Sequence, residues 1–198
     1  MCQKPRILID WDDTLADLCP VWIDELNKKF ALEASIEELN GWDMGVLFPS
    51  LTKEQIVSPL TEEDFWKKVV AKPDAMEVLP LLLDEGYDIY ICTATDYRNL
   101  KRKVDDAVLR YFPYIDHTQI ICCHHKQMIC GDLLIDDNIN NLVGGTYRGL
   151  LFTAQHNKNI DINSYEDITR VDNWYECYDW IQQNLPAGFA KQKINEGD

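Results

Sequence analysis

The 198-residue sequence lacks any apolar segment long enough to enter or cross a membrane. Near the N-terminus, only Ile7, Leu8 and Ile9 form an apolar run before the first acid, Asp10. A signal peptide needs about 7–15 apolar residues and a membrane span needs about 20. We therefore expect no secretory signal, no membrane partner and a cytoplasmic location.

Paired cysteines are also missing. No two cysteines are separated by two residues, and the seven that exist are scattered: Cys2, Cys19, Cys92, Cys122, Cys123, Cys130 and Cys177. This pattern is typical of reduced thiols rather than of a disulfide framework. The run Cys122-Cys123-His124-His125 suggests zinc, but adjacent side chains of an extended backbone point in opposite directions. We favour the interpretation that a strand ends here in a polar loop.

Positive charge is scarce, since 19 Lys and Arg residues stand against 34 Asp and Glu, and the formal net charge is −15. Such a surface repels the phosphates of nucleic-acid polymers and of anionic membranes. Polymeric nucleic acid is therefore excluded as a partner. A ligand that carries a phosphate needs a site where this charge is locally reversed. With 46% hydrophobic and 27% charged residues, the chain otherwise has a globular composition.

The pattern of apolar residues predicts the order of the elements. Buried strands are expected at residues 7–9, 87–92, 118–122, 133–135 and 149–153. Helices are expected to begin near Pro20, Ser35, Thr52 and Thr61, and to cover 75–82, 101–111 and 174–181. Strands that alternate with helices favour an α/β fold with a doubly wound parallel sheet.

The segment 18–72 contains no predicted strand. We therefore expect it to form a small helical cap domain inserted after the first strand, while residues 1–17 and 73–198 form the core domain. About the last ten residues are expected to be a frayed tail.

Polar residues follow three of the predicted strands at their carboxyl ends, where open α/β sheets bind ligands. Asp10 and Asp12 follow the first strand, Thr93 follows the second and Asp136 follows the fourth. Carboxylates gathered in one crevice repel one another, and Mg²⁺, which prefers oxygen ligands, relieves this repulsion. Lys126 and the Thr93 hydroxyl would complete a phosphate site. Taken singly, each feature is also typical of a solvated loop or a surface lysine.

The order of these features resembles the haloacid dehalogenase (HAD) superfamily. A strand followed by Asp10-Trp11-Asp12-Asp13-Thr14 comes first, then a strand that ends in Thr93, then Lys126, and then a strand followed by Asp136-Asp137. The receiver domains of response regulators also use acids, Thr and Lys, but their lysine comes last. Because the acidic pair follows Lys126 here, we favour a HAD-like, Rossmannoid core.

The resemblance implies a role for each motif residue. It implies that Asp10 is the nucleophile that forms an aspartyl-phosphate and that Asp12 is the general acid and base. Thr93 and Lys126 are the implied phosphate ligands. The implied metal ligands are Asp10, Asp12 through its backbone carbonyl, and Asp136. The remaining motif residues are implied to orient the site: Asp137 and Thr14.

At the level of the family, the chain resembles the 5′(3′)-deoxyribonucleotidases. The similar segments are 7–17, 91–93, Lys126 with 132–137, 151–154, and His156-Asn157. Their spacing is similar too, and together they cover most of the chain. The resemblance implies a Mg²⁺-dependent enzyme that hydrolyses nucleoside monophosphates, with deoxyribonucleotides favoured.

The cap usually decides the substrate in this superfamily. Aromatic stacking holds a nucleobase with about 1–3 kcal/mol per base, and aromatic residues also fill the core of a small cap. The candidate base contacts in the cap are Trp42, Phe65 and Trp66. Ala94 is a further candidate contact and stands where mammalian members carry a hydroxyl residue. Two other departures that bear on selectivity are Asn138 in place of arginine and Leu18 in place of an aromatic residue.

Two alternatives remain open. The same chemistry could act on another small phosphomonoester. From a different class of function, the chain could be an inert binding protein with a HAD-like fold, although no motif position is lost. The composition also leaves the oligomeric state open, including a homodimer.

Overall fold

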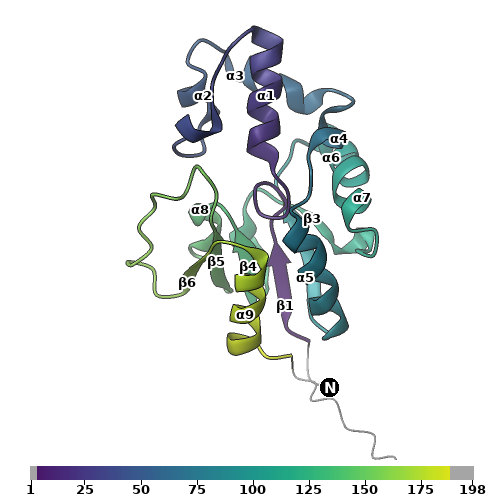
Figure 1. Cartoon of the computed structure of the whole chain (residues 1–198). Helices are drawn as coiled ribbons and strands as arrows, with labels where there is room; N and C mark the ends of the chain where they lie inside the picture. The colour runs from purple at the N-terminus through teal and green to yellow at the C-terminus, as the bar shows by residue number, and fades with distance from the viewer. Residues whose placement is uncertain (1–3, 188–198) are drawn as a thin grey trace, which may run out of the picture.

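A six-stranded parallel sheet lies at the centre of the molecule (Figure 1). The computed structural model describes residues 4–187, so the predicted frayed tail lies outside the described residues. The strand order is β3-β2-β1-β4-β5-β6, and all neighbours are parallel. The strands are β1 Arg6–Ile9, β2 Asp88–Thr93, β3 Ile120–Cys122, β4 Leu133–Asp136, β5 Arg148–Phe152 and β6 Ile168–Val171. The predicted α/β class with a doubly wound parallel sheet is confirmed.

The register of the sheet brings the carboxyl ends of its central strands together. Ile9 of β1 pairs with Ile91 of β2 on one side and with Ile135 of β4 on the other. All three residues are fully buried, as expected for apolar runs without alternation, because both faces of these strands are covered. The residues that follow Ile9 and Ile135 are Asp10 and Asp136, which therefore lie side by side at the same edge.

The prediction from the sequence does not include β6. Ile168 and Val171 of this strand are buried, whereas Thr169 is exposed and Arg170 is half-buried. β6 pairs only with β5 and forms one edge of the sheet. A short edge strand with polar residues at its centre has neither a continuous apolar run nor a clear alternation, so its sequence is indistinguishable from that of a loop.

Helices cover both faces of the sheet (Figure 1). They are α5 Pro73–Asp84, α6 Tyr97–Lys103, α7 Leu109–Tyr111, α8 Ile139–Leu142 and α9 Trp174–Asn184. α5 and α9 pack together on one face, while α8 packs against β4 and β5 on the other. The helix predicted over 101–111 begins earlier, at Tyr97, and one turn of π-helix, Val104–Val108, joins α6 to α7. No helix among residues 4–187 is long and apolar enough to cross a membrane.

Residues 18–72, here called the cap, stand above the carboxyl edge of the sheet (Figure 1). Their helices are α1 Leu18–Phe30, α2 Met44–Leu47, α3 Lys53–Val57 and α4 Phe65–Lys68. Met44 and Phe48 belong to an apolar cluster within the cap, whereas Phe65 and Trp66 pack into the main core beside the sheet. The cap therefore has its own core and is also anchored to the sheet. Its domain boundaries at 18 and 72 stay a prediction.

Two of the helix starts predicted within the cap, at Thr52 and Ser35, have different outcomes. At Thr52 the backbone N–H of Gln55 donates to the threonine hydroxyl at 3.3 Å, and the Gln55 side chain accepts from the N–H of Thr52 at 2.8 Å. This reciprocal pair begins α3. The signal at Ser35 begins only a 3₁₀ turn, Ile36–Glu38.

Leu134→Ala is expected to lower the free energy of unfolding by about 2–5 kcal/mol, because it leaves a cavity at a fully buried position. Leu134 packs with Leu8 and Leu151 on the α8 face of the sheet. Urea unfolding measures the loss. The matched control is Leu81→Ala on α5, where the side chain is 49% exposed and the expected change is about 0.5 kcal/mol or less. Equal losses in both variants would contradict the description of this core.

Candidate active site

Three carboxyl groups meet at the carboxyl edge of β1 and β4. Asp10 follows β1, Asp136 ends β4 and Asp137 comes next. One oxygen of each lies within 4.8 Å of the others, and all three residues are buried. Burial raises the pKa of Asp136 to about 6 and also raises the pKa of Asp137, because the ionised carboxylate loses its hydration. The sheet therefore concentrates negative charge where water cannot screen it.

Lys126 lies among these carboxyl groups. It begins a 3₁₀ turn, Lys126–Met128, and is 1% exposed. Its Nζ donates to Asp10 and, at 2.5 Å, to Oδ2 of Asp136. Burial acts to lower the pKa of the Lys126 ammonium, but the two carboxylates outweigh this effect and raise the pKa above its ordinary value. Lys126 is therefore a charged group at the centre of the site.

A second buried lysine, Lys103 at the end of α6, pairs with Asp12. Its Nζ lies 2.5 Å from Oδ2 of Asp12, while Oδ1 of Asp12 has no hydrogen-bond partner among residues 4–187. Burial raises the pKa of Asp12, and the charge of Lys103 opposes this rise. Lys103 is absent from the residues predicted from the sequence. The sequence around it carries no signal for this role, because its burial, like that of Asn99 one turn earlier, follows from the packing of α6.

Both predicted threonines are fully buried, and their hydroxyls have no hydrogen-bond partner within the described residues. Thr93 is the last residue of β2. The backbone carbonyl of Thr14 accepts from the indole N–H of Trp174 at 3.0 Å, which ties the loop after β1 to α9. In the same loop Asp13 has a φ of 51°, and its side chain accepts from the backbone N–H of Cys19 at 3.0 Å. The loop that carries Asp12 is thus held by contacts of the two residues that follow Asp12.

The loop after β5 supports Asp137. The Nδ2 of Asn157 donates to the backbone carbonyls of Asp137 and Phe152, each at 2.7 Å, and Arg170 donates to Oδ1 of Asn157 at 3.1 Å. Nε2 of His156 lies 2.9 Å from Oδ2 of Asp137 without the alignment of a hydrogen bond. Burial lowers the pKa of His156 to about 4, so the ring is neutral at pH 7. Both residues of the His156-Asn157 motif therefore contact Asp137.

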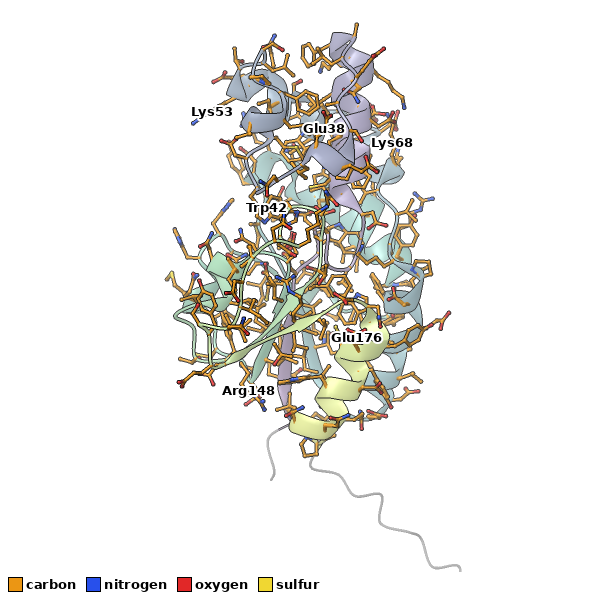
Figure 2. All side chains as sticks on the ribbon, turned by 60° about the vertical axis from the view of Figure 1, so that its left-hand side comes forward. Glu38, Trp42, Lys53, Lys68, Arg148 and Glu176 are labelled. Carbon is orange, nitrogen blue, oxygen red and sulfur yellow. The ribbon has the colours of Figure 1, made fainter. Side chains whose placement is uncertain are left out.

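A cavity of about 370 Å³ lies between the cap and the carboxyl edge of the sheet. The charged residues that line it include Asp10, Asp12, Lys103, Lys126 and Asp137. The other lining residues include Leu18, Trp22, Trp42, Trp66, Ala94 and Asn138. Figure 2 shows Trp42 in the part of the cap nearest the sheet. Of the predicted substrate contacts, only Phe65 does not line this cavity, because its ring packs edge-on against Trp66 in the main core.

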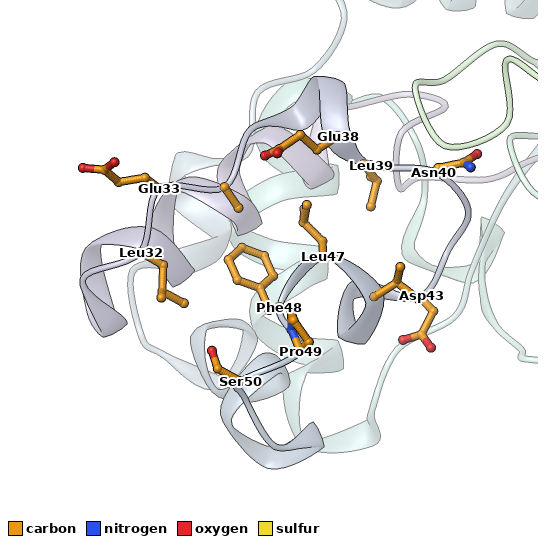
Figure 3. A pocket seen from close by; sticks show the side chains of 12 residues that line it. Leu32, Glu33, Glu38, Leu39, Asn40, Asp43, Leu47, Phe48, Pro49 and Ser50 are labelled. Atoms are coloured by element: carbon orange, nitrogen blue, oxygen red, sulfur yellow. The ribbon is translucent and has the colours of Figure 1, made fainter.

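A second cavity, of about 530 Å³, lies within the cap (Figure 3). It is lined by apolar side chains such as Leu39, Leu47 and Phe48 together with the acids Glu33 and Glu38. Its lining residues include no Lys, Arg or His. A phosphate there would meet only negative charge. Although this cavity is larger, it does not fit the chemistry of the motif residues.

The charge of the site favours a divalent cation. Its carboxyl groups outnumber its two ammonium groups, and both side-chain oxygens of Asp137 have no hydrogen-bond partner among the described residues. Unpaired, buried carboxylate oxygens are the ligands that a hard cation such as Mg²⁺ prefers. Asp10, Asp136 and Asp137 therefore fit a metal ion of this class.

A neighbouring group of side chains fits a metal less well. Donor atoms of Asp13, Cys19 and His156 lie equally close together. Burial and the charge of Asp13 raise the pKa of the Cys19 thiol. A thiol binds metal as a thiolate, so this group is better described as a packed polar cluster beside the first one.

Comparison with known proteins covers nearly the whole chain. The family model described as "5′ nucleotidase, deoxy (Pyrimidine), cytosolic type C protein" (NT5C) matches residues 4–187. The chain belongs to this family. The 5′(3′)-deoxyribonucleotidase of Clostridium acetobutylicum is 32% identical over 175 residues, which are 88% of this chain and 93% of that relative. The 5′(3′)-deoxyribonucleotidase of Bacillus subtilis is 28% identical over 173 residues, 85% of this chain and 98% of that relative. The resemblance to the deoxyribonucleotidases is thus confirmed.

Solved structures of other proteins have a fold similar to that of this family member. A HAD family hydrolase from Deinococcus radiodurans, with bound phosphate and sodium, matches with a TM-score of 0.61 at 16% identity, over 93% of this chain and 98% of that chain. A HAD hydrolase of family IA from Entamoeba histolytica matches with a TM-score of 0.56 at 13% identity, over 87% of this chain and 94% of that chain. Identities this low show the fold alone. They confirm the HAD-like fold.

We expect Mg²⁺ to raise the Tm of this family member. An ion that binds only the folded state adds about 2.7 kcal/mol of stability at 100 times its Kd, and here it also relieves repulsion among Asp10, Asp136 and Asp137. Differential scanning fluorimetry with and without Mg²⁺ measures the shift. Asp137→Asn is expected to reduce it, whereas Asp84→Asn, at the exposed end of α5, is expected to leave it unchanged. An equal shift in all three proteins would contradict this metal site.

Proposed function

We propose that the protein is a Mg²⁺-dependent phosphomonoesterase that hydrolyses nucleoside monophosphates, with deoxyribonucleotides preferred. The observation that carries the proposal is one cavity in which two motif carboxyl groups and a buried ammonium group lie beside aromatic walls: Asp10, Asp12, Lys126, Trp22, Trp42 and Trp66. The family description as a 5′ nucleotidase supports this reaction, and the word "cytosolic" in it supports a cytoplasmic location. The net charge of −15 supports a monomeric rather than a polymeric substrate.

The phosphate group of the substrate binds between Lys126 and Thr93 in this proposal. The Lys126 ammonium donates charge-assisted hydrogen bonds to phosphate oxygens. The Thr93 hydroxyl is buried at the end of β2 without a partner in the described chain, so a phosphate oxygen can take that place. Both contacts orient the phosphorus towards Asp10.

The reaction proceeds in two displacements. A carboxylate oxygen of Asp10 bonds to phosphorus while the ester P–O bond breaks, and the proton on Oδ1 of Asp12 passes to the leaving oxygen. In the second step Oδ1 of Asp12 takes a proton from water, whose oxygen bonds to phosphorus as the bond to Asp10 breaks. Oδ1 suits both transfers because Oδ2 already accepts from Lys103.

The proposed metal ligands are Asp10, Asp136 and the backbone carbonyl of Asp12, with Asp137 beside them. When bound there, Mg²⁺ supplies positive charge that offsets repulsion between the phosphate and the carboxylate nucleophile. Asn157 keeps Asp137 in place through the backbone carbonyl of that residue. Lys126 already neutralises part of the charge on Asp10 and Asp136.

The nucleobase is proposed to pack against the tryptophans of the cap. Trp22 is fixed by its indole N–H, which donates to the carbonyl of Ile56 at 2.7 Å. The Trp42 ring packs on the His156 ring with the two centres 4.4 Å apart. Both aromatic faces are therefore held before a substrate arrives. The small Ala94 and the uncharged Asn138 line the same cavity and leave room near the sugar.

A substrate panel tests the proposed function directly. We expect hydrolysis of deoxynucleoside monophosphates to exceed that of ribonucleotides and of sugar phosphates, and to require Mg²⁺. Asp10→Asn is expected to lower kcat by about 10⁴-fold or more, because the nucleophile is lost. Phosphate release measures both effects, and Asp84→Asn is the control. Activity that persists undiminished in Asp10→Asn would refute the nucleophile, and equal turnover of sugar phosphates would favour the alternative of another small phosphomonoester.

Trp42→Leu tests the proposed base contact. Loss of one stacking partner is expected to raise KM for nucleotides by about tenfold, within the range of one base–aromatic contact. A small phosphate ester without a base, glycerol phosphate, is expected to keep its KM, since it does not reach the cap. Steady-state kinetics on the two substrates decide the question. A parallel rise in both KM values would place Trp42 outside the base site.

A further inference from the structure

Lys103 is a buried charged residue to which the mechanism above assigns only its contact with Oδ2 of Asp12. It is fully buried, although lysine is rarely buried unless it is paired. Its ammonium donates to Oδ2 of Asp12 at 2.5 Å and lies 4.9 Å from the centre of the Trp66 ring. In the part of the chain that the structure describes, Asp12 is its only hydrogen-bond acceptor. Lys103 therefore touches one motif residue and one residue of the cap.

The backbone at Lys103 is unusual as well. Lys103 ends α6, and the π-helix Val104–Val108 begins at the next residue. A π-helical turn inserts an extra residue into a helix and is frequently found at functional sites. Ala107 and Val108 of this turn are fully buried, so the irregular turn is fixed by packing against the core. The direction of Lys103 is fixed with it.

The two buried lysines contact different acids of the site. Lys126 contacts Asp10 and Asp136, whereas Lys103 contacts Asp12. The nucleophile and the proton-transfer group thus have separate cations. Asp12 therefore has its own hydrogen-bond donor and compensating charge, separate from those of Asp10.

We infer that Lys103 is a positioning residue for proton transfer by Asp12. By holding Oδ2, Lys103 leaves Oδ1 as the oxygen that carries the proton. When the Oδ1–H bond breaks and the proton passes to the leaving oxygen, Asp12 becomes a carboxylate, and the ammonium beside it stabilises that charge. The electron pair of the breaking P–O bond stays on the leaving oxygen and accepts the proton. This inference rests on the proposed function.

Trp66 strengthens the contact between Lys103 and Asp12. Its ring covers the ammonium from the cap side, and its indole N–H donates to the carbonyl of Leu60 at 3.1 Å, which fixes the ring. A cation over an aromatic face is attracted to it, more so when water is excluded. A residue of the cap therefore covers the Lys103 ammonium only in part, since Lys103 and Asp12 both line the cavity.

The leaving group provides the test. A nucleoside leaves as a strongly basic alkoxide and needs a proton, whereas p-nitrophenolate leaves without one. We expect Lys103→Met to lower kcat/KM for a deoxynucleoside 5′-monophosphate by about 100-fold, within the range of general acid catalysis, and that for p-nitrophenyl phosphate by about threefold or less. The ratio kcat/KM is used because it reports the step in which the leaving group departs, before the water step that both substrates share.

Two further variants accompany this measurement. Lys101→Met, on the same helix with an exposed side chain that pairs with Asp105, is the matched control and is expected to change neither value. Lys103→Arg keeps the charge and is expected to lose less than Lys103→Met, still selectively on the nucleotide. If Lys103→Met does not fold, as judged by circular dichroism, the arginine variant carries the same comparison.

A double-mutant cycle shows whether Lys103 acts through Asp12. In the Asp12→Asn background, Lys103→Met is expected to cause no further loss on p-nitrophenyl phosphate or on the nucleotide. An equal loss on both substrates, or additive losses in the cycle, would overturn the inference and make Lys103 a phosphate ligand or a purely structural residue. If the unmodified protein hydrolyses neither substrate, the proposed function itself fails, which is a separate outcome.

Discussion

The site depends on one electrostatic constraint, which is that carboxyl groups buried side by side must be compensated. Burial raises the pKa of Asp136 and of Asp137, so without compensation these groups tend to become neutral and useless as metal ligands. Lys126 compensates Asp10 and Asp136, and Lys103 compensates Asp12. The unpaired oxygens of Asp137 leave the remaining negative charge for a divalent cation. The charge balance of the site therefore favours a bound divalent cation, independently of the proposed reaction.

The sheet meets this constraint because β1 lies at its centre. β2 flanks it on one side and β4 on the other, so Asp10 at the end of β1 has neighbours from both. Thr93 comes from β2 and Asp136 from β4. The side chains within these strands are apolar, and the polar side chains lie at the carboxyl ends of the strands. The same packing that stabilises the sheet thus fixes the distances among the motif residues.

Sequence patterns predict the residues of the site that follow strand ends. They do not predict the residues whose place in the site depends on tertiary packing. Asp10 and Asp136 follow apolar runs, so both the strands and their carboxyl ends can be recognised. Lys103 cannot be found in this way, because its burial depends on the docking of α6 beside Asp12. Phe65 and Trp66 are adjacent and equally buried, yet only Trp66 lines the cavity. Which of two neighbouring rings lines the cavity depends on how the cap packs on the sheet, and the local sequence does not indicate it.

The net charge of −15 acts differently at the surface and in the site. Exposed charges are screened beyond about 8 Å at physiological ionic strength, whereas buried charges are screened much less. The buried lysines of the described chain, Lys103 and Lys126, both line the cavity. A small phosphate ester that enters it leaves the screened acidic field and meets two ammonium groups which, together with a bound divalent cation, would offset the charge of the buried carboxylates. A polymer would keep most of its phosphates outside, against the acidic surface, so the same charge distribution that admits a mononucleotide disfavours a nucleic acid.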